Sequence, residues 1–383
     1  MRVRFKSSSA TGLATNSFFV VAIMFCLFLK VSPLKAQSNK VIIGYVGGFR
    51  GLVKTDLIQA RKLTHINYAF VDIKDNRAWL HREATDTLNF RHLILLKKDN
   101  PSLKVLISIG GWTWSGRFSD AVLTDTSRQR FAASAVSIIK KFDLDGIDID
   151  WEYPGQPGYE GNVYRPEDKE NYTLLIKQLR LQMDSLGQQT GKKYLLTTAV
   201  GASKGYLDHT NMGDAQQYLD FVNLMTYDYS GDKIATHHTG LYASKVYKAG
   251  KNADNAVTVF KAAGVPANKM VMGIAFYGHS VILTKGAKGL GDSIATYSKG
   301  LGYTAIKDSI LKLPGFKVYH DRAAKADYIF NKQTLQFISF DDEWSVKQKC
   351  KYVKREKMAG AMFWEYDSDL KGYLLDEIND MLK

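Results

Sequence analysis

Eight apolar runs typical of β-strands recur along the chain, and segments with helical patterning separate them. The runs occupy residues 41–45, 64–71, 104–109, 144–151, 194–200, 221–227, 270–276 and 358–364. Helices are predicted over 128–141 and 168–183; in the second, Leu175, Leu179 and Met183 form one apolar stripe. This alternation predicts an α/β fold, a closed (β/α)8 TIM barrel. A doubly wound open sheet is the alternative, but neither common glycine-rich phosphate loop follows the first strand.

A long connection separates the seventh and eighth runs. Residues 279–336 carry glycine-rich turns and short aromatic stretches. Ordinary barrel loops are a few residues long, so this length predicts a small α+β insertion between strand seven and strand eight. Because it follows a strand, the insertion should lie at the carboxyl face of the barrel, where active sites of this fold are built. We expect the catalytic barrel to span residues 37–383.

The first 36 residues have the pattern of a signal peptide. Arg2, Arg4 and Lys6 precede an apolar core over 17–29, and Ala36 offers a cleavage point. The core is short for a membrane span, and no other stretch of 18 apolar residues follows. We expect a protein exported to the periplasm or the cell exterior, without membrane association after processing. The alternative is that the segment is not cleaved and anchors the protein in the membrane.

Charge argues against nucleic acid as a partner, and cysteine content argues against a disulfide. The leader holds five basic residues and no acid, so its removal lowers the formal net charge from +14 to +9. The remaining lysines are scattered, which gives nucleic-acid binding little support. Cys350 is then the one cysteine, so no internal disulfide is expected, and a chain of this length buries an adequate core without one. We expect a monomer, and interpret the lysine-rich stretch 347–357 as a solvated helix face.

Four carboxylates alternate with apolar residues in the segment Asp-Gly-Ile-Asp-Ile-Asp-Trp-Glu that begins at Asp145. Alternate strand residues face opposite sides, so Asp148, Asp150 and Glu152 should share one face. Like charges on one face of an apolar strand cost stability, which sequences accept mainly at functional sites. Asp145 is an odd number of positions away, faces differently, and is assigned a structural, supporting role around the site.

Other interpretations of these residues are weaker. A helix–loop–helix calcium site needs glycine at its sixth position, whereas Gly146 is second here. An acidic, solvated edge strand would not place isoleucines and a tryptophan opposite the acids and then stop at Pro154. His237 and His238 suggest metal binding but lack a third ligand at a sensible spacing, so no metal and no other cofactor is predicted.

Polar and aromatic residues occur where the predicted strands end. In chain order they are Tyr45, Ser108, Trp112, Trp114, Glu152, Tyr153, Met225, Tyr227, Asp228, Tyr277 and Trp364. In a barrel these ends meet at the carboxyl face. Acids surrounded by tyrosine and tryptophan suit sugars, whose rings have apolar faces for stacking and hydroxyls for directed hydrogen bonds.

The order of the acids suggests their roles. Glu152 is nearest the mouth and could protonate a leaving oxygen. Asp148 and Asp150 lie deeper and close together, where they could share a proton. That arrangement keeps the pKa of a neighbouring acid elevated, as a general acid near neutral pH requires. No second carboxylate on this strand is obviously placed as a nucleophile.

Together these motifs resemble the chitinases of glycoside hydrolase family 18. The resemblance is carried by residues 145–154, by 108–111 with Trp112 and Trp114, by 225–228, and by Trp364. It spans about residues 40–380, and the acidic motif is very specific. The family segment after strand seven usually ends Tyr-Gly-Arg, whereas this chain has His279 in place of the arginine.

The resemblance implies a retaining, substrate-assisted mechanism on chitin or chito-oligosaccharides. Glu152 would act as general acid and then base, while the 2-acetamido oxygen of the substrate attacks the anomeric carbon and gives an oxazolinium intermediate. Asp150 would orient the acetamido group and Asp148 would share its proton. The implied substrate-binding residues are Tyr227 on the acetamido carbonyl, Asp228 and Tyr45 on the distorted sugar, Trp364 beneath it, and Trp112, Tyr153 and Met225; Ser108 would sit behind the acids.

Two alternatives of different kinds remain. An endo-β-N-acetylglucosaminidase that cuts N-glycans would share this mechanism. A non-catalytic chitin-binding lectin would typically lack the glutamate that this chain keeps as Glu152.

Overall fold

The computed structural model of the chain describes residues 40–229, 231, 233–248 and 250–383. The predicted signal peptide lies outside these residues. Within the described ranges, no helix is long and apolar enough to cross a membrane.

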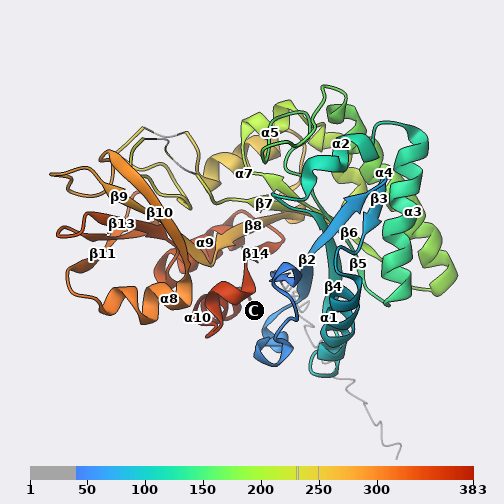
Figure 1. The fold of residues 1–383 in the computed structure, drawn as a ribbon, viewed down its shortest axis with the longest axis horizontal. Coiled ribbons are helices and arrows are strands. Elements are labelled where there is room, and N and C mark those ends of the chain that lie inside the picture. The colour runs from blue at the N-terminus through green and yellow to red at the C-terminus, as the bar shows by residue number, and fades with distance from the viewer. Residues whose placement is uncertain (1–39, 230, 232, 249) are drawn as a thin grey trace, which may run out of the picture. The chain divides into compact units, whose positions relative to one another are not determined.

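Eight parallel strands close into a barrel (Figure 1). They are β1 (Val41–Gly47), β2 (His65–Lys74), β4 (Lys104–Gly110), β5 (Gly146–Asp150), β6 (Leu195–Gly201), β7 (Phe221–Met225), β8 (Met270–Ala275) and β14 (Gly360–Trp364). Neighbours follow the order β1-β14-β8-β7-β6-β5-β4-β2, and β1 also pairs with β2, which closes the ring. The short β3 (Arg77–Trp79) runs antiparallel along the end of β2. The predicted (β/α)8 barrel is confirmed, and every predicted strand is present.

Helices lie between the barrel strands, and a last helix follows β14. They are α1 (Glu83–Leu95), α2 (Phe118–Ala121), α3 (Asp125–Lys141), α4 (Asp168–Thr190), α5 (Lys204–Asp208), α6 (Met212–Ala215), α7 (Ala253–Ala262), α9 (Glu343–Arg355) and α10 (Tyr373–Leu382). The apolar stripe predicted in α4 is fully buried at Leu175, Leu179 and Met183. At the start of α3, Thr124 and Ser127 form a reciprocal capping box, which satisfies backbone donors that have no partner inside the helix.

A second sheet occupies the chain between β8 and α9. Its five antiparallel strands are β9 (Tyr277–Leu283), β10 (Ile294–Gly302), β11 (Phe316–Asp321), β12 (Ala326–Asn331) and β13 (Gln336–Phe340), in the order β10-β9-β13-β12-β11. Helix α8 (Tyr303–Asp308) follows β10. The sheet has its own apolar cluster, with Val281, Leu283, Phe330 and Phe337 buried. Figure 1 shows these strands in orange, as a layer separate from the barrel strands. Because β9 begins two residues after β8, the sheet extends from the carboxyl end of a barrel strand.

One lysine of helix α9 departs from the predicted solvated face. Lys349 is completely buried and its Nζ lies 2.6 Å from Oδ2 of Asp341, which is also completely buried. Burial lowers the pKa of Lys349, and the charge of Asp341 opposes that change. The interpretation holds for Lys347 and Lys351, which are exposed, and is wrong for Lys349, because a buried acid just beyond β13 draws this lysine inward.

Candidate active site

Strand β5 carries its acids into the barrel interior, and Asp148 is bonded there from four other strands. It accepts hydrogen bonds from Tyr45 on β1 (3.0 Å), Ser108 on β4 (2.8 Å), Thr197 on β6 (2.5 Å) and Asn223 on β7 (3.2 Å). Burial raises the pKa of Asp148, and the hydrogen bonds from these four donors act in the opposite direction and lower it. The carboxylate therefore has a fixed position at the bottom of the site.

Two of these donors were not predicted. Thr197 and Asn223 are polar residues inside apolar strands, and both are buried. Thr197 stands directly opposite Asp148 in the register of β5 and β6. A polar residue inside an apolar strand could have indicated a hydrogen-bond donor to Asp148. That inference requires the register of the neighbouring strands, which the sequence does not give.

Asp150 lies one strand layer nearer the carboxyl face than Asp148. It is 4% exposed, and among the described residues its Oδ1 has no hydrogen-bond partner. Burial raises the pKa of Asp150 well above its usual value, and the negative charges of Glu152 and Asp148 raise it further. A proton on this carboxyl is thus favoured in the free protein.

Glu152 follows β5 and is held by its backbone. Its N–H donates to Oγ of Ser115 (2.9 Å), and the amide of Asn162 donates to its carbonyl oxygen (3.1 Å). Burial raises the pKa of its carboxyl to about 7; a hydrogen bond from Tyr153 opposes this shift and the charge of Asp228 adds to it. A carboxylic acid with this pKa can hold and release a proton near neutral pH.

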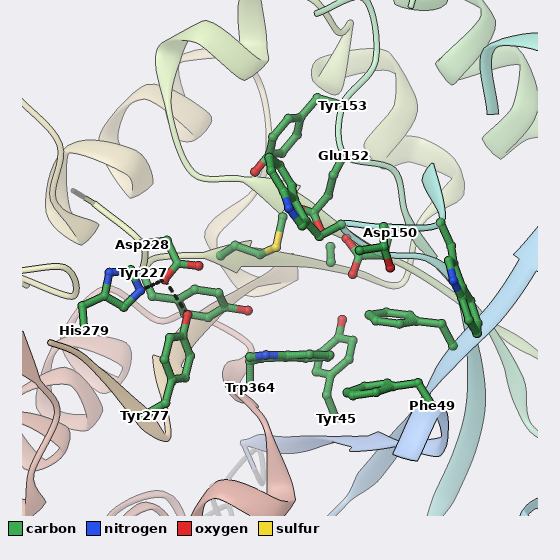
Figure 2. A pocket seen from close by; sticks show the side chains of 16 residues that line it. Tyr45, Phe49, Asp150, Glu152, Tyr153, Tyr227, Asp228, Tyr277, His279 and Trp364 are labelled. Atoms are coloured by element: carbon green, nitrogen blue, oxygen red, sulfur yellow. Dashed lines mark hydrogen bonds and ion pairs between the residues drawn. The ribbon is translucent and has the colours of Figure 1, made fainter. Parts of the chain in front are cut away.

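A cavity of about 720 Å³ opens between Asp150 and Glu152 on one side and Trp364 on the other (Figure 2). Its walls include Asp150 and Glu152 and every residue expected to bind substrate: Tyr45, Trp112, Tyr153, Met225, Tyr227, Asp228 and Trp364. Asp148 and Ser108 are not in the wall but are hydrogen-bonded to each other beneath it. Phe49, Phe70, Thr113, Trp114, Ala199, Tyr277 and His279 complete the lining.

The floor of the cavity is aromatic. Trp364 is stacked with Phe70 (5.4 Å between ring centroids, 18° between planes) and with Phe49 (6.2 Å, 17°). Figure 2 shows Trp364 beneath Asp150 and Glu152. Such a platform offers a flat apolar face on which a sugar ring can stack. Sequence reasoning missed Phe49 and Phe70; Phe70 stands near the end of the second apolar run, whereas Phe49 carried no signal.

The upper wall is also aromatic but more open. Trp112 is 48% exposed, and its ring meets the edges of Tyr153 (6.2 Å) and Tyr159 (6.1 Å). Trp114 contacts the edge of Phe70 at 6.5 Å. Both tryptophans of this loop therefore reach the cavity, one at the mouth and one beside the floor.

Asp228 stands at the far wall, where its carboxylate is bonded by two residues of β9. Oδ1 accepts a hydrogen bond from the hydroxyl of Tyr277 (2.6 Å) and lies 2.8 Å from Nε2 of His279. Partial desolvation acts to raise the pKa of Asp228, whose side chain is 54% exposed, but His238 and His279 outweigh it and hold the pKa well below its usual range. His279, where the related motif has arginine, thus pairs with Asp228.

Asp145 does not lie beside the site. Its carboxylate accepts a hydrogen bond from the N–H of Val105 (2.7 Å) and pairs with Lys97 (2.7 Å) and Lys104 (3.7 Å). These contacts fit the structural role expected of Asp145, but they hold the chain just before β5 and not the acids of the site. Asp145 lies three positions before Asp148 along the chain, a span of about 10 Å toward the amino face.

A (β/α)8 barrel whose carboxyl face holds buried acids over an aromatic floor has the architecture of a glycosidase. The family model "Glycosyl hydrolases family 18" matches residues 41–369. The chain belongs to glycosyl hydrolase family 18 and is an enzyme of that family.

Several relatives are similar over most of the chain. "Chitinase A1" of Niallia circulans is 40% identical over 407 residues, covering 89% of this chain and 58% of that protein. "Endochitinase 1" of Metarhizium robertsii is 32% identical, covering 82% of this chain and 77% of that protein. The chain thus spans little more than half the length of Chitinase A1.

Solved structures have the same fold. A family 18 N-acetylglucosaminidase from Paenibacillus barengoltzii superposes with a TM-score of 0.81 at 39% identity, covering 90% of this chain and all of that one. Chitinase ChiA74 from Bacillus thuringiensis superposes with a TM-score of 0.84 at 32% identity, covering 90% of this chain and 70% of that one.

Proposed function

We propose that the enzyme is a chitinase, which cleaves β-1,4 linkages between N-acetylglucosamine units with retention and with the help of the substrate's 2-acetamido group. The observation that carries the proposal is Glu152, a carboxyl at the wall of the cavity whose pKa burial raises to about 7. Relatives named as chitinases support chitin and chito-oligosaccharides as the substrate class.

The reaction has two steps in this proposal. Glu152 first gives its proton to the glycosidic oxygen, and the acetamido oxygen bonds to the anomeric carbon as the bond to the leaving sugar breaks. The products are the shortened sugar, an oxazolinium ion and the Glu152 carboxylate. Glu152 then takes a proton from water, whose oxygen attacks the anomeric carbon and reopens the ring. Two inversions restore the starting configuration.

Other residues hold the acetamido group and the sugar. Asp150 orients the acetamido nitrogen and stabilises the positive charge of the oxazolinium ion, and Asp148 shares its proton with Asp150. Tyr227 donates to the acetamido oxygen. Trp364 supports the distorted sugar from below, while Asp228 and Tyr45 hold it from the sides.

Digestion of chitohexaose by the purified protein tests this proposal. We expect shorter oligomers by mass spectrometry, and the β-anomer as the first new reducing end by NMR.

The sizes of the first products show the mode of cleavage. A mixture of dimers, trimers and tetramers from the start indicates endo action, dimers alone indicate exo or processive action, and monomers from the start indicate an N-acetylglucosaminidase. Release of N-glycans from a glycoprotein without cleavage of chitohexaose contradicts the proposal in favour of an endoglycosidase, and binding without cleavage does so in favour of a lectin.

We also propose that the protein is exported and that residues 1–36 are removed. The basic start and the apolar core of this segment support the proposal. Sequencing the amino terminus of protein from the periplasm and the medium should show a chain that begins at Gln37. An intact Met1 in the cytoplasmic fraction contradicts export.

A further inference from the structure

Three side chains with metal-binding atoms meet beside the cavity. Asp228 follows β7, His238 lies in the connection before α7, and His279 lies on β9. One carboxylate oxygen and one nitrogen of each ring lie within 4.8 Å of one another. We propose that these residues, here the His–His–Asp site, bind a divalent transition-metal ion such as Zn²⁺, and that the bound ion inhibits the enzyme.

The donor set matches such an ion. Zn²⁺ and Co²⁺ are well served by two imidazoles and a carboxylate, whereas Mg²⁺ and Ca²⁺ prefer oxygen alone. Two ligand atoms about 2.1 Å from a tetrahedral ion are about 3.4 Å apart. Oδ1 of Asp228 lies 2.8 Å from Nε2 of His279 and 3.7 Å from Nδ1 of His238, so both distances are already close to this spacing.

His238 provides an independent indication of a ligand. It is 1% exposed, and neither of its ring nitrogens has a hydrogen-bond partner among the described residues. A buried polar group without a partner is costly and uncommon. An ion at this point satisfies one of its nitrogens.

One ring must turn when the ion binds. The rings of His238 and His279 are stacked, with centroids 4.4 Å apart and planes 9° from parallel. The lone pair of an imidazole lies in the ring plane, so two parallel rings do not point at a common ion. His238 is held by its burial, whereas the side chain of His279 is 39% exposed and has room to rotate. His279 is therefore the mobile ligand.

Inhibition follows from the position of Asp228. A bound ion takes the Asp228 carboxylate from the cavity and from the hydroxyl of Tyr277. The ion also offsets the negative charge of Asp228, which raises the pKa of Glu152. The pKa of Glu152 therefore falls, and less of its acid form is present at neutral pH. This consequence rests on the proposed function, whereas binding of the ion does not.

The chain holds a second trio of this kind, which serves as a matched control. His320, Asp327 and Asp342 also bring their ligand atoms within 4.8 Å of one another. His320 pairs directly with Asp327, and these residues do not line the cavity. The variant H320Q removes this trio's imidazole and leaves the His–His–Asp site intact.

Titration of tag-free, chelator-treated protein with Co²⁺ tests binding, since Co²⁺ bound at low coordination number absorbs visible light. In the H320Q protein we expect this absorption to saturate at one ion per chain. We expect H320Q/H279Q, in which glutamine can still donate to Asp228, to lose it while keeping its Tm within a few degrees. The same loss is expected in H320Q/H238Q. No absorption in H320Q, or absorption that survives both second substitutions, overturns the site.

Activity provides the second measurement. Zn²⁺ should lower chito-oligosaccharide hydrolysis by wild type and H320Q at least tenfold, with full recovery in EDTA. The ratio of rates with and without Zn²⁺ should be near one for H279Q, whatever its own basal rate. Co²⁺ absorption without inhibition leaves the site standing and contradicts the role proposed for Asp228. Equal inhibition of H279Q and wild type contradicts the His–His–Asp site as its cause.

Discussion

The hydroxyl of Tyr45 on β1 donates a hydrogen bond of 3.0 Å to Oδ2 of Asp148 on β5, across the interior of the barrel. The same hydroxyl accepts a hydrogen bond from Asn223 on β7 (3.1 Å). Tyr45 also lines the cavity, so one side chain joins the buried carboxylate to the space above it.

Replacing Tyr45 with phenylalanine should therefore lower both stability and turnover. Two buried hydrogen bonds are lost, the one to Asp148 and the one from Asn223, so we expect the free energy of unfolding to fall by about 1–3 kcal/mol. We expect kcat on chito-oligosaccharides to fall about tenfold, equivalent to about 1.4 kcal/mol. Urea unfolding and initial rates measure both. Tyr164→Phe, at a tyrosine that is 49% exposed and outside the cavity lining, is the control. An unchanged kcat in Y45F contradicts this role for Tyr45.

The pH dependence of activity should report Glu152. Its pKa in the folded protein is raised to about 7, so the acid form needed for the first step is lost as the pH rises through that value. We expect kcat/KM to fall about tenfold per pH unit above about pH 7. A rate that stays level to pH 9 contradicts the assignment.

The same shift predicts a change in stability. Because the folded pKa lies above the unfolded one, the folded state binds more protons between about pH 4.5 and pH 7, and stability falls as the pH rises through this window. Glu152→Gln cannot titrate. As the pH rises through this window, the unfolding free energy of wild type should therefore fall relative to that of E152Q. A difference independent of pH contradicts the shift.

Removing the aromatic floor should weaken productive binding. Trp364→Ala deletes the ring that stacks with Phe49 and Phe70. We expect kcat/KM to fall at least about tenfold, the equivalent of about 1.4 kcal/mol of transition-state binding. Trp79→Ala is the control, since Trp79 is 45% exposed and does not line the cavity. Equal loss in both variants would mean that the effect on W364A is not specific to the floor.

The buried pair of Lys349 and Asp341 should be strongly coupled. Lys349→Met leaves the Asp341 carboxylate buried without its cation, which costs about 3–5 kcal/mol. Adding Asp341→Asn should recover much of this loss. Urea unfolding of the two single variants and the double variant measures the coupling. Additive losses would show that the two side chains act independently.

The sequence predicted those parts of the fold that depend on local periodicity. The apolar runs indicated the barrel strands, and the alternation in β5 predicted that Asp148, Asp150 and Glu152 share a side. The partners of Asp145 were not predicted, because alternation gives the face on which a strand residue lies but not the segments that pack against it.

Contacts between distant segments were beyond the sequence. His238 lacked a third ligand in the local sequence, yet the structure brings it to Asp228, earlier in the same connection between β7 and α7, and to His279 on β9. Lys349 was predicted to be exposed because its helix is rich in lysine, and only the position of Asp341 explains its burial. The donors Thr197 and Asn223 depend in the same way on strand register.

The central claim is that Glu152 is the acid that cleaves the glycosidic bond, and Glu152→Gln tests it most directly. Glutamine has nearly the same shape but cannot transfer the proton. We predict that kcat on chitohexaose falls by about 10²–10⁴-fold, while calorimetry shows the oligosaccharide still bound with an affinity close to that of wild type. Turnover within a few-fold of wild type, with unchanged product sizes, would contradict the account.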